Sequence, residues 1–343
     1  MNTLDINIHK LMEAYNVPGL SMAAIHNGTI TSKESVGLLE AETAKSVERC
    51  SIFSACSISK FLTSILVLKM TEQGVLDLDE DVNEKLTSWK VPHNEFNKKV
   101  TLRNLLSHQS GLVDPEGSFS EFKATSGIPA MAELLEGRTP YCDAPLEVNY
   151  EPGSDFHYSD AGFSVIQLMI EDVTGKPFQD VVHEQIFQPL GMKNSTYNLP
   201  VTEETLKSFS CGHDKFGEVL TDKHPVYPYP AAAGLWTTPS DLALLVIELM
   251  NSLKGESKLK ISKAKAAEMI TQQGCRAWTG LGVFLEDNEK GLEMSSLGWG
   301  VGFQCMMAAY PYLGTGLIIM TNTDPGVHQL KGMIGEIYNV YPF

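Results

Sequence analysis

The hydrophobic pattern at the two ends of the chain is typical of β-strands. Residues 20–25 form an apolar run and residues 29–37 a second strand candidate, and His26-Asn27-Gly28 between them favours a hairpin turn. Near the other end, three ranges alternate or are apolar throughout, 280–286, 303–310 and 315–321, and residues 327–338 are predicted to form a closing helix. The pattern therefore predicts strands at both ends of the chain.

Helical patterns and loops rich in proline and glycine alternate in the middle. Strands at both ends around a helical middle predict an α/β fold of the α+β type, in which helices flank one antiparallel sheet. We expect a sheet domain built from residues 1–76 and 252–343 and a mostly helical domain from residues 77–251. The active site is expected at the interface between these two domains.

Ser57 and Lys60 precede the most apolar helical pattern of the chain, which covers residues 61–70. Three other Ser-x-x-Lys sequences start at Ser120, Ser257 and Ser262, but they lie in polar stretches that are typical of a loop or a solvated helix face. A lysine at the start of a buried helix is uncommon unless it is paired or functional. This context singles out the first pair.

A spacing of three residues on a helix places the side chains of Ser57 and Lys60 on one face. A serine hydroxyl is a weak nucleophile until a neighbouring base takes its proton, and lysine is such a base only when its pKa is lowered. The residues alone leave a catalytic role and a structural role equally open.

Composition narrows the classes of protein and partner. The chain has 343 residues, of which 43% are hydrophobic and 20% charged, as in soluble globular proteins. Its net charge of −16 argues against nucleic acid and anionic membranes as main partners. We expect a small-molecule or short-peptide substrate and no membrane span, since no stretch approaches the ~20 apolar residues that a span needs.

The six cysteines follow no pattern, and the first residues do not form a signal peptide, so we expect free thiols and a cytoplasmic protein. Cys-x-x-Cys, His-Glu-x-x-His and the phosphate-binding Gly-x-x-x-x-Gly-Lys motif are absent from the sequence. We therefore expect no metal and no cofactor. The Gly-x-Ser-x-Gly motif is also absent, which argues against an α/β-hydrolase nucleophile elbow.

Two further segments are candidates for the site. Tyr158 stands at a predicted loop-to-helix junction, where it is either a structural tyrosine or, beside a lysine ammonium, a group able to shuttle a proton. Residues 295–303 are rich in glycine, which either allows a ligand to approach the backbone closely or forms a turn into a strand.

Taken in order, these segments resemble the serine β-lactamase and penicillin-binding-protein superfamily, in its class C β-lactamase-like branch of esterases, D-peptidases and acyltransferases. The resemblance covers nearly the whole chain. The segments that carry it are 53–60, 100–112, 151–160, 173–178, 189–192 and 233–242.

The resemblance implies a β-lactamase/transpeptidase-like fold and a mechanism through an acyl-enzyme. Ser57 is then the nucleophile, and Lys60 and Tyr158 are the general base and the proton relay. The backbone N–H groups of Ser57 and Trp299 form the oxyanion hole, in which each donor typically lowers the barrier by about 3 kcal/mol.

The sequence departs from the family pattern at two substrate-binding positions. Asp160 stands where the family usually has asparagine, and Ser296-Leu297-Gly298 stands where it has Lys-Thr-Gly or His-x-Gly. Asp160 is expected to raise the pKa of Lys60 and shift proton transfer towards Tyr158, or to receive a substrate amine. A site poorer in positive charge favours neutral or cationic substrates.

These features together predict a serine hydrolase that acts on an ester or an amide. Esterase chemistry is favoured because Ser296-Leu297-Gly298 lacks the cation of the corresponding family motif. A D-amino-acid peptidase or amidase, a β-lactamase and an acyltransferase are alternatives within the same family. A catalytically impaired, ligand-binding family member is the alternative from another class.

Overall fold

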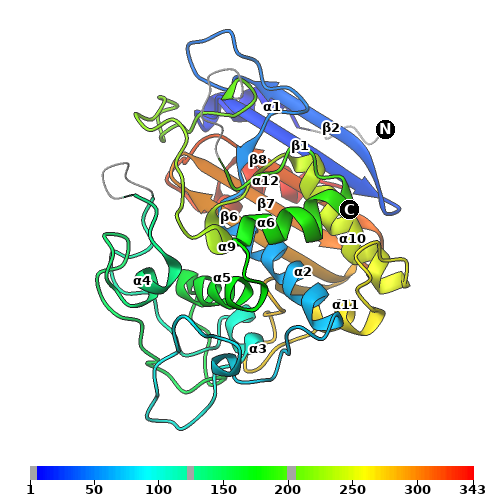
Figure 1. The fold of residues 1–343 in the computed structure, drawn as a ribbon. Coiled ribbons are helices and arrows are strands. Elements are labelled where there is room, and N and C mark those ends of the chain that lie inside the picture. Colours follow the sequence, from blue (N-terminus) through cyan, green and yellow to red (C-terminus); the bar gives the residue numbers. More distant parts are fainter. Residues whose placement is uncertain (1–5, 122–126, 199–205) are drawn as a thin grey trace.

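The strands from both chain ends form one sheet in the computed structural model, which describes residues 6–121, 127–198 and 206–343. The sheet is antiparallel with the order β2-β1-β8-β7-β6-β5, so the N-terminal hairpin pairs with the C-terminal strands (Figure 1). Its strands are β1 (Gly19–His26), β2 (Thr29–Gly37), β5 (Phe284–Asn288), β6 (Gly291–Gly300), β7 (Phe303–Tyr310) and β8 (Thr315–Thr321). The predicted fold class is confirmed.

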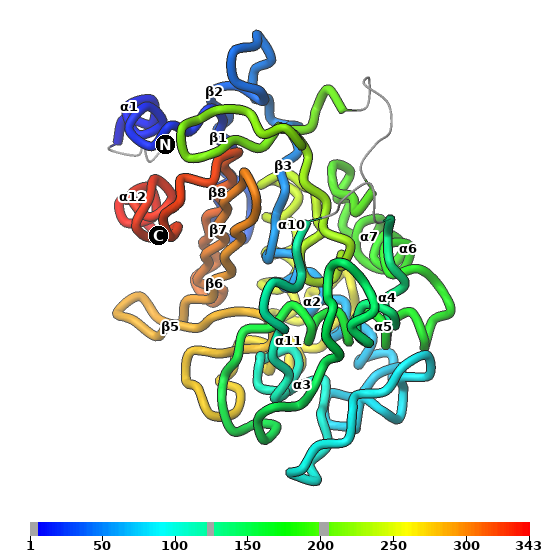
Figure 2. Tube along the Cα trace, turned by 90° about the vertical axis from the view of Figure 1, so that its left-hand side faces the viewer, coloured from blue at the N-terminus to red at the C-terminus, as the bar shows by residue number. Residues whose placement is uncertain are grey.

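Helices cover both faces of this sheet, as Figure 2 shows. Helices α1 (Ile8–Ala14) and α12 (Met333–Val340) lie on one face, where they close a small apolar cluster. On the other face α10 (Pro239–Lys254) packs against β1 and β8. All side chains of β7 and β8 are buried as a result.

In the described part of the middle of the chain, short helices and the longer α5 alternate with loops near α2 (Ser59–Glu72). A two-stranded sheet of β3 (Phe53–Ser54) and β4 (Trp236–Thr237) leads into this region. Its α-helices are α3 (Leu102–Leu106), α4 (Met131–Leu135), α5 (Asp160–Thr174), α6 (Phe178–Val182), α7 (Gln188–Leu190) and α9 (Pro230–Ala233), and α11 (Lys263–Met269) follows α10.

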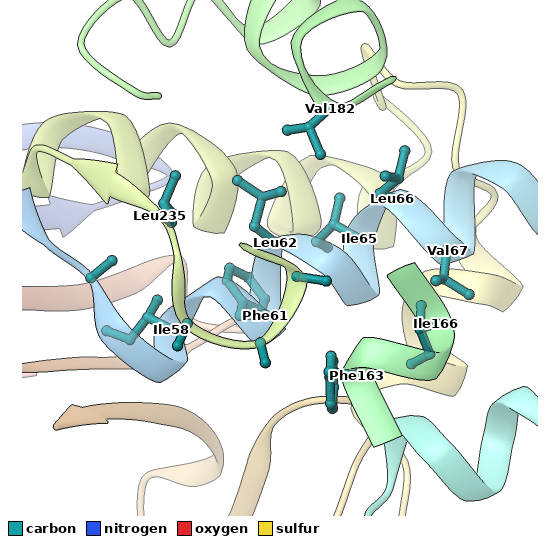
Figure 3. Close-up of a cluster of buried hydrophobic side chains, with 14 of the residues drawn as sticks. Ile58, Phe61, Leu62, Ile65, Leu66, Val67, Phe163, Ile166, Val182 and Leu235 are labelled. Carbon is teal, nitrogen blue, oxygen red and sulfur yellow. The ribbon is translucent and has the colours of Figure 1, made fainter. Parts of the chain in front are cut away.

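Helix α2 is buried on nearly all sides, as its apolar sequence predicts. Figure 3 shows Leu66 on the side of Val182, whereas Val67 lies on the side of Ile166 from α5. The residues of α2 from Ser59 to Leu68 are all buried, including Lys60. The interpretation of this segment as a buried helix is therefore confirmed.

Two boundaries differ from the sequence-based expectation. The strand predicted to start at residue 280 begins at Phe284, because Gly282 adopts a left-handed φ of +71° and turns tightly against α2. The closing helix predicted from residue 327 begins at Met333, after the 3₁₀ turn Gln329–Lys331. Among the residues that the structure describes, no helix is long and apolar enough to cross a membrane.

The division into two domains stays a prediction.

Lys123, the partner of Ser120 in the second Ser-x-x-Lys sequence, lies outside the described residues.

Candidate active site

Ser57 lies in a single 3₁₀ turn, Cys56–Ile58, that leads directly into α2. Its neighbours Cys56 and Ile58 are buried, whereas Ser57 itself is partly exposed. Cys56 has a left-handed φ of +47°, a conformation that non-glycine residues adopt at a cost of roughly 1–2 kcal/mol. The side chain of Ser59 holds this turn by donating to the Cys56 carbonyl at 2.6 Å and accepting from the Leu235 amide at 3.0 Å.

The ammonium group of Lys60 has a hydrogen-bond acceptor for each of its three protons. Its Nζ lies 3.2 Å from Ser57 Oγ, 2.5 Å from Asp160 Oδ1 and 2.9 Å from the Ala232 carbonyl oxygen. Burial by itself favours the neutral amine, yet the charge of Asp160 and the nearby Tyr158 raise the pKa of Lys60 well above its usual value. Lys60 is therefore a charged donor to Ser57 in this state.

Asp160 is the first residue of α5, and the buried turn before it is fixed by Asp114. The carboxylate of Asp114 accepts hydrogen bonds from Ser159 Oγ at 2.7 Å, the Asp160 amide at 2.8 Å and the Ala161 amide at 3.0 Å. Burial, and next the charge of Asp160, raise the pKa of Asp114, while these three hydrogen bonds oppose the shift. A carboxylate at a helix N-terminus satisfies amides that the helix leaves unpaired.

Tyr158 comes from the loop before α5 and lies beside both Lys60 and Ser57. The Lys60 Nζ is 4.8 Å from the centre of the Tyr158 ring. The residue is 44% exposed, but the protein around its hydroxyl excludes water there, and this desolvation raises the pKa of the phenol. The charge of Lys60 opposes the shift without reversing it. The phenol is thus protonated at neutral pH.

The His108 ring packs against the Tyr158 ring. Its ring stacks on the Tyr158 ring with a centroid separation of 4.4 Å and an interplanar angle of 26°. Its Nδ1 accepts a hydrogen bond from the Ser159 amide at 3.1 Å. Burial, and next the charge of Lys60, lower the pKa of His108 to about 3, so the imidazole is neutral. Neither His108 nor Asp114 is among the site residues predicted from the sequence.

The third predicted segment lies on β6, next to the nucleophile turn. Residues 294–300 of β6 pair with β7, whereas β5 pairs only with residues 291–295. The other edge of residues 296–300 therefore has no β5 partner. A Cβ atom on Gly298 would lie 2.4 Å from the Ala55 carbonyl oxygen, so only glycine fits at this crossing. The Gln329 side-chain amide donates to the Gly298 carbonyl at 2.8 Å and so helps to hold the strand in place.

Ser296 and Leu297 line a small cavity together with Ser57, Lys60 and Tyr158. Of the described residues that line it, Lys60 is the one cation, since His108 is neutral. Trp299, which follows Gly298 on the same strand, is 43% exposed. The structure places Ser57, Lys60, Tyr158, Ser296 and Leu297 around this cavity, with Asp160 on Lys60 and with Gly298 and Trp299 next along β6. The catalytic and substrate-binding roles of these residues stay predictions.

Metal ligation has no basis in the described part of the chain. No group of three or more histidine, cysteine, aspartate or glutamate side chains lies close enough together there to hold a metal ion. The Ser57 hydroxyl, the Lys60 ammonium and the Tyr158 phenol lie close enough together for proton transfer.

The comparison with known families decides the classification. The model of the Beta-lactamase family matches residues 4–337. The chain belongs to the Beta-lactamase family. This family assignment agrees with the order of the sequence segments and with the juxtaposition of Ser57, Lys60 and Tyr158.

Curated relatives are distant. The chain is 25% identical over 237 residues to Protein flp of Staphylococcus aureus strain MW2, which covers 69% of the chain and 45% of that protein. It is 26% identical over 276 residues to Penicillin-binding protein 4 of Amycolatopsis lactamdurans, which covers 77% of the chain and 68% of that protein. The chain thus spans less than half the length of the flp relatives that it matches.

Solved structures share the fold at low sequence identity. The octameric penicillin-binding protein homologue from Pyrococcus abyssi has a TM-score of 0.76 and 20% identity, covering 97% of this chain and 76% of that one. The D-alanine carboxypeptidase AmpC from Burkholderia cenocepacia has a TM-score of 0.74 and 18% identity, covering 97% of each chain. At this level of identity the likeness shows the fold alone.

Proposed function

We propose that the protein is a serine hydrolase that forms an acyl-enzyme on Ser57 and acts on carboxylic esters. The observation that carries the proposal is the contact of Ser57 Oγ with the Lys60 ammonium at 3.2 Å. Tyr158 lies beside the same ammonium and is the third group of the site. A serine is activated when neighbouring groups take its proton as it attacks. The membership of the Beta-lactamase family supports the same chemistry.

Tyr158 is the proton acceptor in this proposal. All three protons of Lys60 are held by acceptors, so Lys60 is charged and stabilises negative charge on Ser57 and Tyr158. The phenolate form of Tyr158, which is the minor form at neutral pH, takes the Ser57 proton during attack and returns it to the leaving group. The backbone N–H groups of Ser57 and Trp299 bind the oxyanion that forms on the substrate carbonyl.

Ester substrates are favoured over β-lactams because the cavity next to Ser57 has Ser296 where a substrate carboxylate would need a cation. A neutral ester requires no such partner, and it also has a better leaving group than an amide. The negative charges of Asp160 and Asp114 near the site further disfavour anionic substrates.

A D-amino-acid amidase or peptidase is the second candidate, and Asp160 is the residue that favours it. Its carboxylate is partly exposed at 23%, so one face is open to a substrate ammonium. One of the structural relatives is described as a D-alanine carboxypeptidase. Transfer of the acyl group from Ser57 to an acceptor other than water is a variant of the same chemistry.

The test compares three substrates on one preparation: methyl butyrate, D-alanine amide and the chromogenic β-lactam nitrocefin. The proposal expects the highest kcat/KM for the ester and the loss of that activity in Ser57→Ala. Fastest turnover of nitrocefin would overturn the argument from Ser296. Activity on none of the three substrates, together with no labelling of Ser57 by a fluorophosphonate probe, would favour a ligand-binding protein.

A further inference from the structure

The cavity beside Ser57 is small and mainly apolar. Ser57, Lys60 and Tyr158 are among the residues that line it, and its free volume is about 20 Å³. On this measure about 10–15 Å³ accommodates one water-sized group, so the cavity accommodates one or two groups of that size. Its apolar lining comes from Leu106, Phe156, Val283, Phe284 and Leu297.

One wall of the cavity is rigid because it is tied to two helices. The Gly282 amide donates to the Leu106 carbonyl at 2.8 Å, which joins the turn before β5 to α3. A Cβ atom on Gly282 would lie 1.9 Å from Ser64 Oγ of α2, so this turn cannot move inward. Val283 and Phe284 follow directly and form the wall itself.

Another part of the lining is aromatic. Phe156 contacts the His108 ring edge to face at 5.5 Å and the Trp278 ring edge to face at 4.5 Å. His108 in turn stacks on Tyr158. Each ring is therefore held by a neighbour, so both parts of the lining resist expansion when a larger group enters.

The position of the cavity relative to the catalytic groups indicates which part of a substrate it receives. Tyr158 and Ser57 line the cavity, whereas Trp299, the second proposed oxyanion-hole donor, does not. Because Tyr158 protonates the departing oxygen, that oxygen lies near the phenol, and the group attached to it lies in the cavity. The acyl group then extends away from the cavity.

We propose that this cavity is a leaving-group pocket that admits an alkoxy group of one or two carbons, so that methyl and ethyl esters are the substrate class. The inference rests on the proposed function and deepens it. Ser57 Oγ bonds to the carbonyl carbon and the bond to the alkoxy oxygen breaks. The serine proton, carried by Tyr158, leaves with the alcohol, and water then releases the acid and restores Ser57.

The test uses four esters of butyric acid that differ only in their alcohol: methyl, ethyl, n-propyl and n-butyl. Hydrolysis is followed by proton release at constant pH. One group too many in a tight apolar pocket costs roughly 10- to 200-fold in kcat/KM. We expect kcat/KM to fall at least about tenfold between the ethyl and the n-butyl ester.

Two variants enlarge the pocket and keep the test decisive if one of them folds poorly. Phe284→Ala and Val283→Ala are each expected to raise the kcat/KM of the n-butyl ester relative to the methyl ester by about tenfold. Phe216→Ala is the matched control, because Phe216 is 66% exposed and lies outside the cavity lining. It should leave the ratio unchanged.

The possible outcomes distinguish a failure of the pocket proposal from a failure of the proposed function. Equal kcat/KM for all four esters in the wild type, with no activity in Ser57→Ala, would overturn the pocket and leave the proposed function intact. A change of the same factor for every ester in both pocket variants would also overturn it. Absence of Ser57-dependent hydrolysis of any ester would overturn the proposed function and the pocket together.

Discussion

The Asp160 carboxylate lies 2.5 Å from the Lys60 ammonium nitrogen and joins the start of α5 to the start of α2. Lys60 is only 3% exposed, so this charge acts through little water. The pair keeps a proton on the lysine that would otherwise be the base for Ser57. Proton transfer from the serine is therefore left to Tyr158.

Replacing Asp160 tests this relationship. Asp160→Asn removes the charge that raises the pKa of Lys60, and each unit by which that pKa falls gives about ten times more neutral amine. We expect kcat on methyl butyrate at pH 7 to rise about tenfold. Asp155→Asn is the matched control, since Asp155 is an exposed acid of the same loop paired with Arg276. A large loss of activity in Asp160→Asn would instead make Asp160 a substrate-binding residue.

The pH dependence of the wild type follows from Tyr158. Desolvation raises the pKa of its phenol above the usual value near 10, and the phenolate is the active form. Below that pKa the active fraction grows about tenfold per pH unit, so kcat/KM should rise through pH 9 without a plateau. Tyr158→Phe should lose about 10²- to 10⁴-fold in kcat. A plateau reached near pH 7 would point to a different base.

His108 is expected to be a positioning residue for Tyr158. His108→Asn tolerates the left-handed φ of +56° and keeps an acceptor for the Ser159 amide, but it loses the ring stack. A stack contributes about 0.5–1.5 kcal/mol, so kcat should fall about 3- to 10-fold with little change in KM. Because the pKa of His108 is about 3, the wild-type profile should have no inflection from it between pH 5 and 8. An equal change in kcat and KM would argue for a purely structural role.

The segment Ser296-Leu297-Gly298 is expected to determine which substrate charge the site accepts. Ser296→Lys adds a cation at the cavity next to Ser57 and fills that cavity with the lysine stem. Charge-assisted hydrogen bonds contribute about 1.5–3 kcal/mol, so kcat/KM for nitrocefin should rise about tenfold or more. Hydrolysis of methyl butyrate should fall in the same variant. Ser296→Ala is the control, and a gain on nitrocefin in both variants would contradict the argument.

The sequence predicted the parts of this molecule that local patterns determine. The buried helix after Lys60 and the hairpin around Asn27-Gly28 were recognisable because apolar spacing and turn chemistry act within a few residues. The sheet joined from both chain ends followed from where the strands lie, and the family followed from an ordered set of sequence segments.

Contacts between distant residues were beyond the reach of such patterns. His108 meets the Ser159 amide across 51 positions of sequence, and Asp114 meets the Asp160 amide across 46. Neither contact has a periodic or compositional signal. The late start of β5 has the same origin, because Gly282 must turn against Ser64 of a helix far earlier in the chain. Only the packed structure reveals these constraints.

The central claim is that Ser57 becomes acylated, and the mass of the intact protein tests it most directly. The protein is mixed with a fluorophosphonate probe, and separately with methyl butyrate followed by rapid acid quenching. The account predicts one added phosphonyl or butyryl group, located on the peptide that contains Ser57 and absent from Ser57→Ala. An unmodified wild-type mass under both conditions, or a label that persists in Ser57→Ala, would contradict it.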